Sequence, residues 1–307
     1  TPLDSHRNPD LSYIHDAVET IAKNVKATTL IVNESTSYPG TLRTEIAARI
    51  TGIFHHYASA PERVDPGNTQ WGTKNTPRLI GGLTPEAVSK AKEFYSSFCD
   101  TVIEVSSPEV AEAAKIFENT FRQVNIALVN ELAQISHALG ISVRETLDAA
   151  DTKPYGFMKF SPSAGVGGHC IPVDPSYLAY VAKGLGVPAT FIERANLVNL
   201  EMPNYIVERV IKDNGGSIAG KKVQVIGVSY KPNVADVRET PVKALILGLK
   251  EKGAKVSWHD DLVKEWNGEK SATLSSDFDL AIIATPHDYL DLKKLGNVPI
   301  LNTRGSI

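Results

Sequence analysis

A cysteine in a glycine-rich segment is the residue whose type and setting most directly suggest chemistry. Cys170 ends the run GVGGHC at 165–170, and Asp174 follows four residues later. Glycine lacks a Cβ, so this backbone can approach a ligand closely. A thiolate is a strong nucleophile where its surroundings favour the charged form. We predict that Cys170 is a nucleophile and that Asp174 orients water or accepts a proton; the alternative is a buried cysteine beside a tight turn.

A lysine and an asparagine share one face of a predicted helix. Lys115 and Asn119 are four residues apart, the spacing that brings side chains together on a helix surface. A partly buried lysine can act as an acid or a base. An amide can donate a hydrogen bond to a developing oxyanion. The alternative is an ordinary solvated helix face.

Further polar residues follow predicted strands, at the positions where α/β folds place ligand contacts. They are Ser35 and Thr36 after the strand at 28–32, and Tyr230, Lys231 and Arg238 after the strand at 222–227. Separately, the loop at 61–68 offers two acids, Glu62 and Asp65. Either acid can serve as a base, although exposed carboxylates are common. The lysine and the arginine suit a phosphate, with a solvated loop as the alternative.

Two other groups of residues carry no functional prediction. His55 and His56 lack the spacing and the acids of a metal site, so we expect an ordinary surface pair and no bound metal. Cys99 stands at the end of a predicted helix, where we expect it to pack in the interior.

Composition excludes several classes of protein. The 307 residues contain 32 basic and 35 acidic side chains, a formal charge of −3, whereas nucleic-acid-binding proteins normally carry a basic excess. No window approaches the roughly 18 consecutive apolar residues of a membrane span, and the first residues do not resemble a signal peptide. The 2 cysteines cannot form a disulfide framework. We therefore expect no nucleic-acid or membrane partner, and a cytoplasmic location.

The predicted elements alternate at both ends of the chain and are helical in the middle. Strands at 28–32, 77–80 and 101–105 alternate with helices at 11–25, 41–50 and from 84 onward, which implies a parallel sheet covered on both faces. From Val110 to Leu139 apolar residues recur every three or four positions. This spacing predicts one helix of roughly thirty residues, about 45 Å long.

The second half of the chain continues with a loop, helices and another sheet. The loop at 151–174 is rich in glycine and proline, and loops of this length are usually functional. Helices are predicted from Ser142, at 176–183 and at 190–212, followed by a linker at 214–216. Strands at 222–227, 255–258, 279–285 and 299–303 predict a second, smaller doubly wound domain, with Arg304 after its last strand.

Taken together, these segments resemble the UDP-glucose/GDP-mannose dehydrogenase family over nearly the whole chain. The matches, in the family's order, are NEST at 33–36, PE at 61–62, Lys115 to Asn119, GGHC at 167–170 with Asp174, 227–231 with Arg238, and TR at 303–304. The phrases PERVDPGN at 61–68 and TKNTP at 73–77 look most like the bacterial UDP-N-acetylglucosamine 6-dehydrogenase branch.

The resemblance implies an NAD-dependent oxidation of the C6 alcohol of a UDP-sugar to a carboxylate, with two hydrides removed in succession. By similarity, Cys170 holds the aldehyde as a thiohemiacetal and then forms a thioester that water cleaves. The other implied catalytic roles are oxyanion stabilisation by Lys115 and Asn119, proton transfer by Asp174 with Lys115, and support of hydrolysis by Thr36 and Glu62.

The resemblance also implies binding roles and a partner. The implied substrate contacts are Glu62, Lys115, Asn119, Tyr230, Lys231 and Arg304, together with Ser161, Gly165 and Gly167 in a stretch that would cover the sugar nucleotide. The implied cofactor contacts are Ser35, Thr36 and Arg238. The long central helix looks like the family's dimer-forming element, so a homodimer is expected.

Two departures move the expected substrate away from UDP-glucose. Family members of the UDP-glucose type carry a second acid where this chain has Pro66, and an arginine donated across the dimer where it has Pro154. We therefore expect UDP-N-acetylglucosamine as the preferred substrate. UDP-N-acetylmannosamine, UDP-N-acetylgalactosamine and UDP-glucose are the alternatives.

A third departure concerns the cofactor domain. The family's G-x-G-x-x-G turn and its ribose-binding acid do not occur in these 307 residues, and Thr1 to Leu3 resemble the end of a strand within that domain. We expect an α/β fold of two doubly wound, Rossmann-like domains joined by a helical domain, with the N-terminal domain incomplete. The expected boundaries are 1–106 for NAD binding, 107–213 for the helical domain and 214–307 for UDP binding.

Two other functions remain open. A non-catalytic UDP-sugar-binding and dimerisation module would fit an incomplete cofactor domain, and micromolar NAD binding would exclude it. An enzyme similar to 6-phosphogluconate dehydrogenase would share the long-helix architecture, but it would leave Cys170 without a role.

Overall fold

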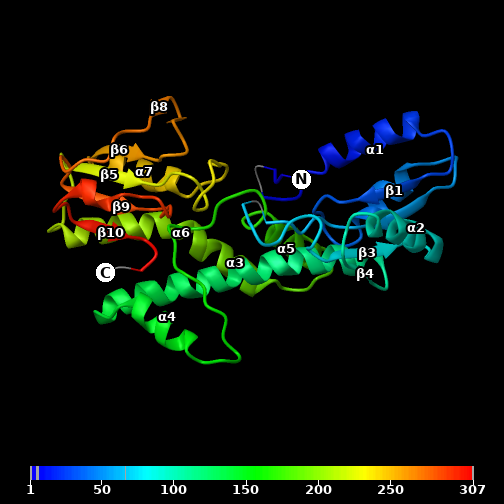
Figure 1. Cartoon of the computed structure of the whole chain (residues 1–307), viewed down its shortest axis with the longest axis horizontal. Helices are drawn as coiled ribbons and strands as arrows, with labels where there is room; N and C mark the ends of the chain where they lie inside the picture. Colours follow the sequence, from blue (N-terminus) through cyan, green and yellow to red (C-terminus); the bar gives the residue numbers. More distant parts are fainter. Residues whose placement is uncertain (1, 5–6, 66, 306–307) are drawn as a thin grey trace. The chain divides into compact units, whose positions relative to one another are not determined.

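The computed structural model describes residues 2–4, 7–65 and 67–305, and the chain divides into two compact units (Figure 1). One unit comprises Thr1–Phe121 with Val173–Ile192, and the other comprises Arg122–Pro172 with Glu193–Ile307. Two of the three divisions fall within long helices, α3 (Pro108–Leu139) and α6 (Thr190–Asp213), and the third falls between Pro172 and Val173. Each unit has its own sheet and its own apolar clusters.

The sheet of the first unit is mixed. Its strands lie in the order β1 (Leu30–Asn33), β2 (His56–Ser59), β3 (Arg78–Gly82) and β4 (Val102–Glu104). β1 pairs with β2 and β3 pairs with β4 in parallel, but β2 and β3 are antiparallel. The expectation of a parallel sheet was wrong here, because the unexpected strand β2 lies between β1 and β3.

The expectation for the histidine pair was also wrong. His55 is buried, with 3% of its surface exposed, and its Nδ1 accepts a hydrogen bond from the Thr29 backbone N–H at 3.3 Å. His56 begins β2 and is half-buried. The pair is therefore not an ordinary surface pair: His55 is buried just before β2, and His56 keeps only part of its surface exposed.

Alternation along β1 explains how helices cover both faces of this sheet. Ile31 packs with α1 (Ser12–Asn24) and with the helical turns at 42–49, whereas Leu30 and Val32 pack with α2 (Pro85–Ser96). The predicted helix at 41–50 is a π-helical turn at Leu42–Ile46 followed by a 3-10 turn at Ala47–Arg49. Cys99 is buried among the residues that pack with α2, as predicted.

The helical prediction for the middle of the chain is confirmed. Helix α3 has 32 residues, and Gly140 with φ 71° follows it in the left-handed conformation that glycine adopts readily. The Ser142 side chain caps α4 (Val143–Asp151) by accepting from the Glu145 N–H. Helix α5 (Asp174–Gly184) begins two residues earlier than expected, so Asp174 lies in its first turn.

The second unit contains the predicted parallel sheet. Its strands lie in the order β10 (Ile300–Asn302), β9 (Leu280–Ile283), β5 (Lys222–Ile226) and β6 (Lys255–His259). Helices α6 and α7 (Val242–Glu251) cover one face. Apolar side chains from 274–298, including a 3-10 turn at Leu292–Leu295, cover the other.

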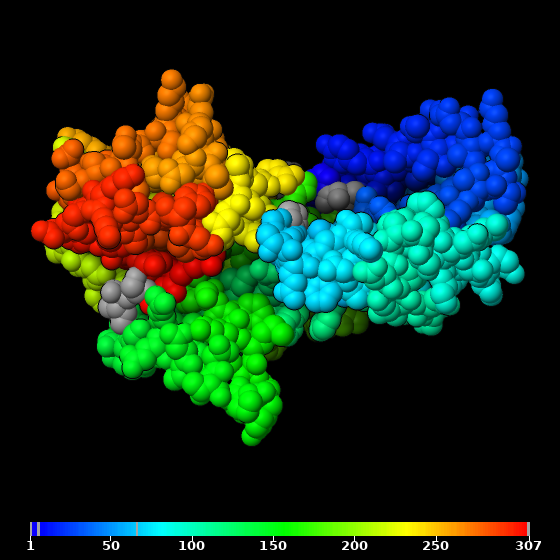
Figure 2. All heavy atoms as spheres, in the orientation of Figure 1, coloured from blue at the N-terminus to red at the C-terminus, as the bar shows by residue number. Residues whose placement is uncertain are grey.

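The second unit also has a tightly packed strand end and a projecting hairpin. Gly227, with φ 80°, ends β5 where an added Cβ would lie 2.0 Å from the Thr285 carbonyl oxygen, so only glycine fits there. The hairpin of β7 (Glu265–Trp266) and β8 (Glu269–Lys270) stands out from the unit's surface (orange in Figure 2). In the described parts of both units, no helix is long and apolar enough to cross a membrane.

Candidate active site

The predicted site residues fall into two sets, one in each unit. The first unit holds Ser35, Thr36, Glu62, Lys115, Asn119 and Asp174. The second unit holds Ser161, Gly165, Gly167, Cys170, Tyr230, Lys231, Arg238 and Arg304.

Helices α3 and α5 bring three of the predicted residues together. The Asn119 Nδ2 donates to Asp174 Oδ2 at 2.5 Å, and the charge of Lys115 acts on the same carboxyl group. Lys115 is 9% exposed and Asp174 is 3% exposed, so this is not a solvated helix face. Burial raises the pKa of Asp174 to about 6, although the Asn119 hydrogen bond and the Lys115 charge oppose this rise. A carboxyl group that titrates near neutrality is suited to transfer protons.

The loops that follow β1 and β2 lie side by side at one edge of the first sheet. The Glu62 N–H donates to the Glu34 carbonyl oxygen at 3.1 Å. Glu62 Oε1 accepts from the backbone N–H groups of Arg63 at 2.7 Å and Val64 at 2.8 Å. Burial alone would raise the pKa of Glu62, but the Val64 and Arg78 hydrogen bonds hold it below its usual range. Glu62 is thus a fixed carboxylate, suited to orient water rather than to take up a proton near neutrality.

Arg78 organises this edge, and no pattern in the sequence pointed to it. Its guanidinium is buried and donates to Glu62 Oε2 at 2.6 Å and to the Ala60 carbonyl oxygen at 3.0 Å. It also lies 3.9 Å from Glu34 and 5.1 Å from the centre of the Tyr95 ring, whose hydroxyl donates to Glu34. One cation therefore holds the carboxylates of both loops.

Replacing Arg78 with methionine should lower the free energy of unfolding by about 2 kcal/mol, because the loss of a buried cation leaves its carboxylate partners without a counter-charge. The solvent exposure of Glu62 keeps the loss below that of a fully buried pair. Arg43→Met is the matched control, because the Arg43–Glu109 pair has a 56% exposed arginine and should contribute less than about 1 kcal/mol. Urea unfolding measures both values, and equal losses would contradict the role given to Arg78.

Two further contacts tie these loops to α3. Glu112, which is 2% exposed, accepts from the Gly40 N–H at 2.7 Å and from the Leu42 N–H at 2.9 Å. Burial raises the pKa of Glu112 to about 7 despite these hydrogen bonds. Arg63 forms an ion pair with Glu118 at 2.7 Å. The only sequence signal for Glu112 is its place three residues before Lys115 on the same helix.

Ser35 and Thr36 lie at the edge of the first sheet where a dinucleotide is expected to bind. They follow β1 at the carboxyl end of the strand, the edge at which such folds bind their ligands. Ser35 is exposed and Thr36 is half-buried, and hydroxyl groups can bond to the ribose or the amide of a nicotinamide nucleotide. These hydroxyl groups fit a contact with NAD, and the contact expected for Ser35 and Thr36 stays a prediction.

In the second unit, Cys170 is exposed and is not part of a disulfide. The alternative of a buried structural cysteine is therefore wrong. The glycines before it allow close packing against protein as well as against a ligand. An added Cβ would lie 2.9 Å from the Tyr230 Cβ at Gly167, and 2.8 Å from the Tyr230 ring at Gly168. The Gly168 N–H also donates to the Arg238 carbonyl oxygen at 3.1 Å.

A pair of buried asparagines fixes the start of the same loop. The Asn130 Nδ2 of α3 donates to Asn199 Oδ1 of α6 at 2.9 Å, and Asn130 Oδ1 accepts from the Ser163 N–H at 2.9 Å. At Gly165, an added Cβ would lie 2.8 Å from the Asn199 carbonyl oxygen. Ser161, just before this anchored part, is exposed. The cysteine loop is thus held at both ends of its glycine run.

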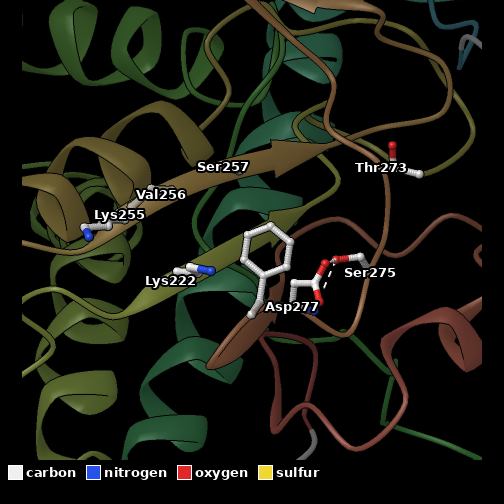
Figure 3. Close-up of a pocket in the computed structure, with 8 residues that line it drawn as sticks. Lys222, Lys255, Val256, Ser257, Thr273, Ser275 and Asp277 are labelled. Carbon is white, nitrogen blue, oxygen red and sulfur yellow. Dashed lines mark hydrogen bonds between the residues drawn. The ribbon is translucent and has the colours of Figure 1, made fainter.

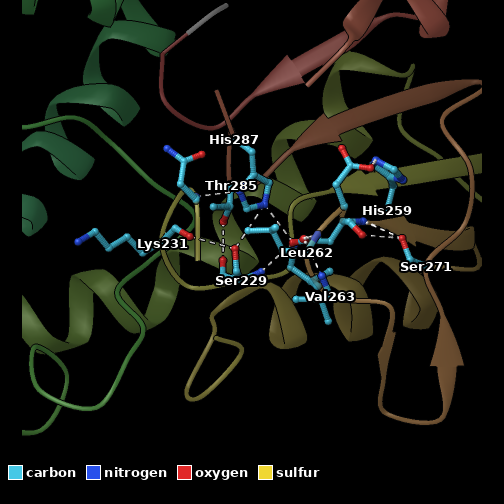
Figure 4. A network of polar contacts seen from close by, with 12 residues as sticks. Ser229, Lys231, His259, Leu262, Val263, Ser271, Thr285 and His287 are labelled. Carbon is cyan, nitrogen blue, oxygen red and sulfur yellow. Dashed lines mark hydrogen bonds and ion pairs between the residues drawn. The ribbon is translucent and has the colours of Figure 1, made fainter. Parts of the chain in front are cut away.

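A buried network positions the loop that carries Tyr230 and Lys231 (Figure 4). The His287 Nδ1 accepts from the Asn233 N–H at 2.9 Å, so its Nε2 carries the proton and donates to Asp260 at 3.1 Å. Ser229 Oγ donates to the Lys231 carbonyl oxygen at 3.0 Å. Burial alone would raise the pKa of Asp260, but hydrogen bonds from His287 and the backbone lower it to about 2.

Arg238 is held by a nearby acid. Its Nε lies 3.0 Å from both carboxylate oxygens of Asp236, and this hydrogen bonding raises the pKa of Arg238 above its usual value. The guanidinium also interacts electrostatically with Tyr230 and Cys170. A neighbouring cation favours the thiolate form of a cysteine. The contact with NAD expected for Arg238 stays a prediction.

Arg304 and a described pocket lie at opposite edges of the second sheet. Arg304 follows β10 at the carboxyl edge and is half-buried. A pocket of about 580 Å³ is lined by Lys222 and Lys255, the first residues of β5 and β6, and by Phe278 (Figure 3). It contains none of the predicted site residues. Among the described residues, no group of three or more histidines, cysteines and acids could hold a metal ion.

Sequence comparisons match all three parts of one enzyme family. The NAD binding domain of the UDP-glucose/GDP-mannose dehydrogenase family matches residues 1–99, its central domain residues 109–201 and its UDP binding domain residues 224–304. The match to the NAD binding domain does not favour the non-catalytic module.

Individual relatives agree with these matches. Protein CapL of Staphylococcus aureus is 36% identical over 96% of this chain and 73% of its own length. A UDP-N-acetyl-D-glucosamine 6-dehydrogenase of Salmonella typhi is 33% identical over 98% of this chain and 74% of its own. The solved structure of a UDP-D-ManNAc dehydrogenase from Pyrococcus horikoshii is 30% identical, with a TM-score of 0.87 over 99% of this chain and 75% of its own. The chain therefore belongs to the UDP-glucose/GDP-mannose dehydrogenase family, whose cofactor is NAD.

Proposed function

We propose that this protein oxidises the C6 alcohol of a UDP-N-acetylhexosamine to the uronate in two NAD-dependent steps, with UDP-N-acetylglucosamine as the preferred substrate. The observation that carries the proposal is an exposed Cys170 on a loop whose glycines are packed against the UDP-binding domain. The buried cluster of Lys115, Asn119 and Asp174 supplies acid–base and oxyanion groups.

The chemistry that bound NAD supplies is hydride acceptance, once in each oxidation. Asp174, with Lys115, takes the proton of the C6 hydroxyl as the alcohol becomes an aldehyde. The Cys170 thiolate then adds to the carbonyl carbon, and a new C–S bond forms. Lys115 and Asn119 stabilise the oxygen of this thiohemiacetal, which carries negative charge as the second hydride leaves. The product of the second oxidation is a thioester on Cys170.

Hydrolysis completes the reaction and restores the cysteine. Water adds to the thioester carbonyl, the C–S bond breaks, and the products are the carboxylate and the Cys170 thiolate. The fixed carboxylate of Glu62 and the hydroxyl of Thr36 orient this water. Asp174, which has passed its first proton to solvent, accepts one proton of the water, and the second proton leaves to solvent from the carboxylic acid product. Water and a base suffice here, because a thiolate is a good leaving group.

The choice of substrate rests on two sequence positions and on the relatives. Pro154, which replaces an arginine of the UDP-glucose type, lies in an exposed loop after α4, whereas Pro66 lies outside the described residues. One relative is a UDP-N-acetyl-D-glucosamine 6-dehydrogenase, and the similar solved structure is of a UDP-D-ManNAc dehydrogenase. Both names support an N-acetylhexosamine.

A substrate panel tests this function. The purified protein is incubated with NAD and UDP-N-acetylglucosamine, UDP-N-acetylmannosamine, UDP-N-acetylgalactosamine or UDP-glucose, and kcat/KM is measured from NADH formation. We expect the highest value with UDP-N-acetylglucosamine. A higher value with UDP-glucose would contradict the assignment to N-acetylhexosamines.

We also propose that two chains associate through α3, which exposes apolar side chains along one side. The exposed residues, at steps of four and seven, are Phe117, Phe121, Leu128, Ile135 and Leu139. Exposed apolar surfaces of this kind typically mark protein–protein contacts. Leu128→Lys should shift the protein from dimer to monomer in sedimentation velocity, whereas Leu247→Lys, at an exposed leucine of α7, should not. A monomeric wild type would contradict this proposal.

A further inference from the structure

The pocket at the amino edge of the second sheet has no part in the proposed reaction. Its volume of about 580 Å³ lies within the range of small-molecule sites, roughly 300–1,000 Å³. Lys222 and Lys255 line it from the first positions of β5 and β6, and Ser275 and Asp277 line it from the segment before β9 (Figure 3). All of these residues belong to the second unit, so the pocket is formed within that unit alone.

The two lysines lie side by side without a counter-charge. Lys222 and Lys255 are directly opposed in the parallel register, and neighbouring strands lie about 4.8 Å apart. Like charges at opposed positions repel each other. Asp279 accepts from the Lys222 backbone N–H at 2.8 Å, but within the described ranges neither lysine ammonium group forms a hydrogen bond or an ion pair. By contrast, Lys252, three residues before Lys255, pairs with Glu208 at 2.9 Å.

Protection of an exposed sheet edge does not explain both lysines. Lysines on an edge strand prevent its pairing with other chains, and Lys255 does begin the edge strand β6. Strand β5, however, lies between β9 and β6, so Lys222 is on an interior strand. Asp277 is the one acid among the described residues that line the pocket, and it accepts from Ser275 Oγ at 3.3 Å. The pocket therefore carries an excess of positive charge.

A buried glutamine next to the pocket has an unsatisfied acceptor. Gln224 follows Lys222 by two positions on the same face of β5, has 0% of its surface exposed, and donates from Nε2 to the Thr273 carbonyl oxygen at 2.8 Å. It is opposed to Ser257 in the register, and both Ser257 and Thr273 line the pocket. Its Oε1 has no hydrogen-bond partner in the part of the chain that the structure describes. Because buried acceptors are nearly always paired, this oxygen favours a ligand with a hydroxyl or N–H donor.

A ligand for this pocket combines an anionic group with an organic body. A phosphate group can accept from two lysines at once, and Phe278 offers the face or edge of a ring for apolar contact. Inorganic phosphate alone would leave both the ring and the buried Gln224 acceptor unused. We propose that the amino edge of the second sheet binds a small organic phosphate that carries hydroxyl or N–H donors, at a site separate from the one that performs the oxidation.

Calorimetric titration with AMP tests this site, with NAD and UDP present at saturating concentrations so that the two expected nucleotide sites are filled. The double variant Lys222→Met/Lys255→Met should raise the Kd for AMP about tenfold or more, because both phosphate contacts are lost. Adenosine, which lacks the phosphate, should bind the wild type and the double variant equally weakly. Lys293→Met/Lys294→Met, at two exposed lysines of the 3-10 turn in the same unit, removes the same charge and should bind AMP like the wild type.

Thermal unfolding separates a binding role from a structural one. Without ligand, Lys222→Met/Lys255→Met should melt at the same temperature as the wild type or higher, because a repulsion is removed, and AMP should raise its Tm less. A lower Tm without ligand, unchanged AMP affinity in the folded double variant, or no binding of AMP by the wild type would overturn the proposal. Binding of an oligoglutamate peptide in place of AMP would also overturn it and assign the lysines to an acidic protein segment. The proposed oxidation is tested separately by the substrate panel and stands whichever result is found.

Discussion

Replacing Cys170 with serine should lower uronate formation by about a thousandfold or more, because a serine hydroxyl is a far weaker nucleophile than a thiolate near neutral pH. Without the thiol, the aldehyde is not held between the two oxidations. Cys170 is exposed, so the substitution should leave the free energy of unfolding unchanged. Product analysis by chromatography, with NADH absorbance in parallel, measures the effect.

The second cysteine provides the matched control for this substitution. Cys99 is buried in the first unit, and its Sγ lies 3.6 Å from the Thr73 carbonyl oxygen. Cys99→Ser should lower stability while the remaining folded enzyme keeps its turnover. Uronate formation by Cys170→Ser at the wild-type rate would contradict the covalent mechanism.

Replacing Asp174 with asparagine should lower kcat by a factor of about 100 to 10,000, the range of a general base. Burial raises the pKa of Asp174 to about 6. A base must be deprotonated, so the wild-type kcat/KM should fall as the pH drops below 6. Asp174→Asn should lose this acid limb, and pH–rate profiles of both proteins measure it.

Two comparisons make the assignment to Asp174 specific. Asp100→Asn changes an exposed aspartate whose nearest cation, Lys74, lies 3.9 Å away, and it should leave the profile unchanged. Glu112 has a pKa of about 7 and also titrates in this range. If the kcat/KM of Asp174→Asn still fell with decreasing pH near pH 7, the remaining titration would be that of Glu112. Full activity of Asp174→Asn would show that Asp174 is not the catalytic base.

The same pKa shift predicts how the stability of the fold depends on pH. The pKa of Asp174 is raised from 3.8 to about 6 in the folded chain, so folding favours the protonated form. The stabilisation that the folded chain gains from protonated Asp174 is fully present below pH 3.8 and is lost as the pH rises through 6. The stability difference between the wild type and Asp174→Asn should therefore change across this interval.

The sequence predicted the fold best where the spacing of apolar residues repeats over many positions. Steps of three and four residues predicted α3 almost to the residue, and with it the common face of Lys115 and Asn119. The parallel sheet of the second unit was also predicted, because its strands are apolar runs separated by helix and turn signals. The glycine run directed attention to Cys170, whose catalytic role stays a prediction, and the segment that packs against these glycines in this structure is that of Tyr230.

The residues that sequence reasoning missed act through contacts between distant segments. Arg78 bonds to Glu62 and lies close to Glu34, 16 and 44 positions earlier, and no local pattern encodes such pairs. Strand β2 was missed because its four residues, HYAS, show neither a clear alternation nor an apolar run. The antiparallel pairing of β2 with β3 could not be predicted once β2 itself was missed.

The ratio of NADH formed to UDP-sugar consumed tests the central claim most directly. The purified protein is given excess NAD and a limiting amount of UDP-N-acetylglucosamine, and the reaction runs to completion. If the sugar stays bound to Cys170 between the two oxidations, each sugar should yield two NADH, and the uronate should be the only product. One NADH per sugar with accumulating aldehyde, or no NADH at all, would contradict the account.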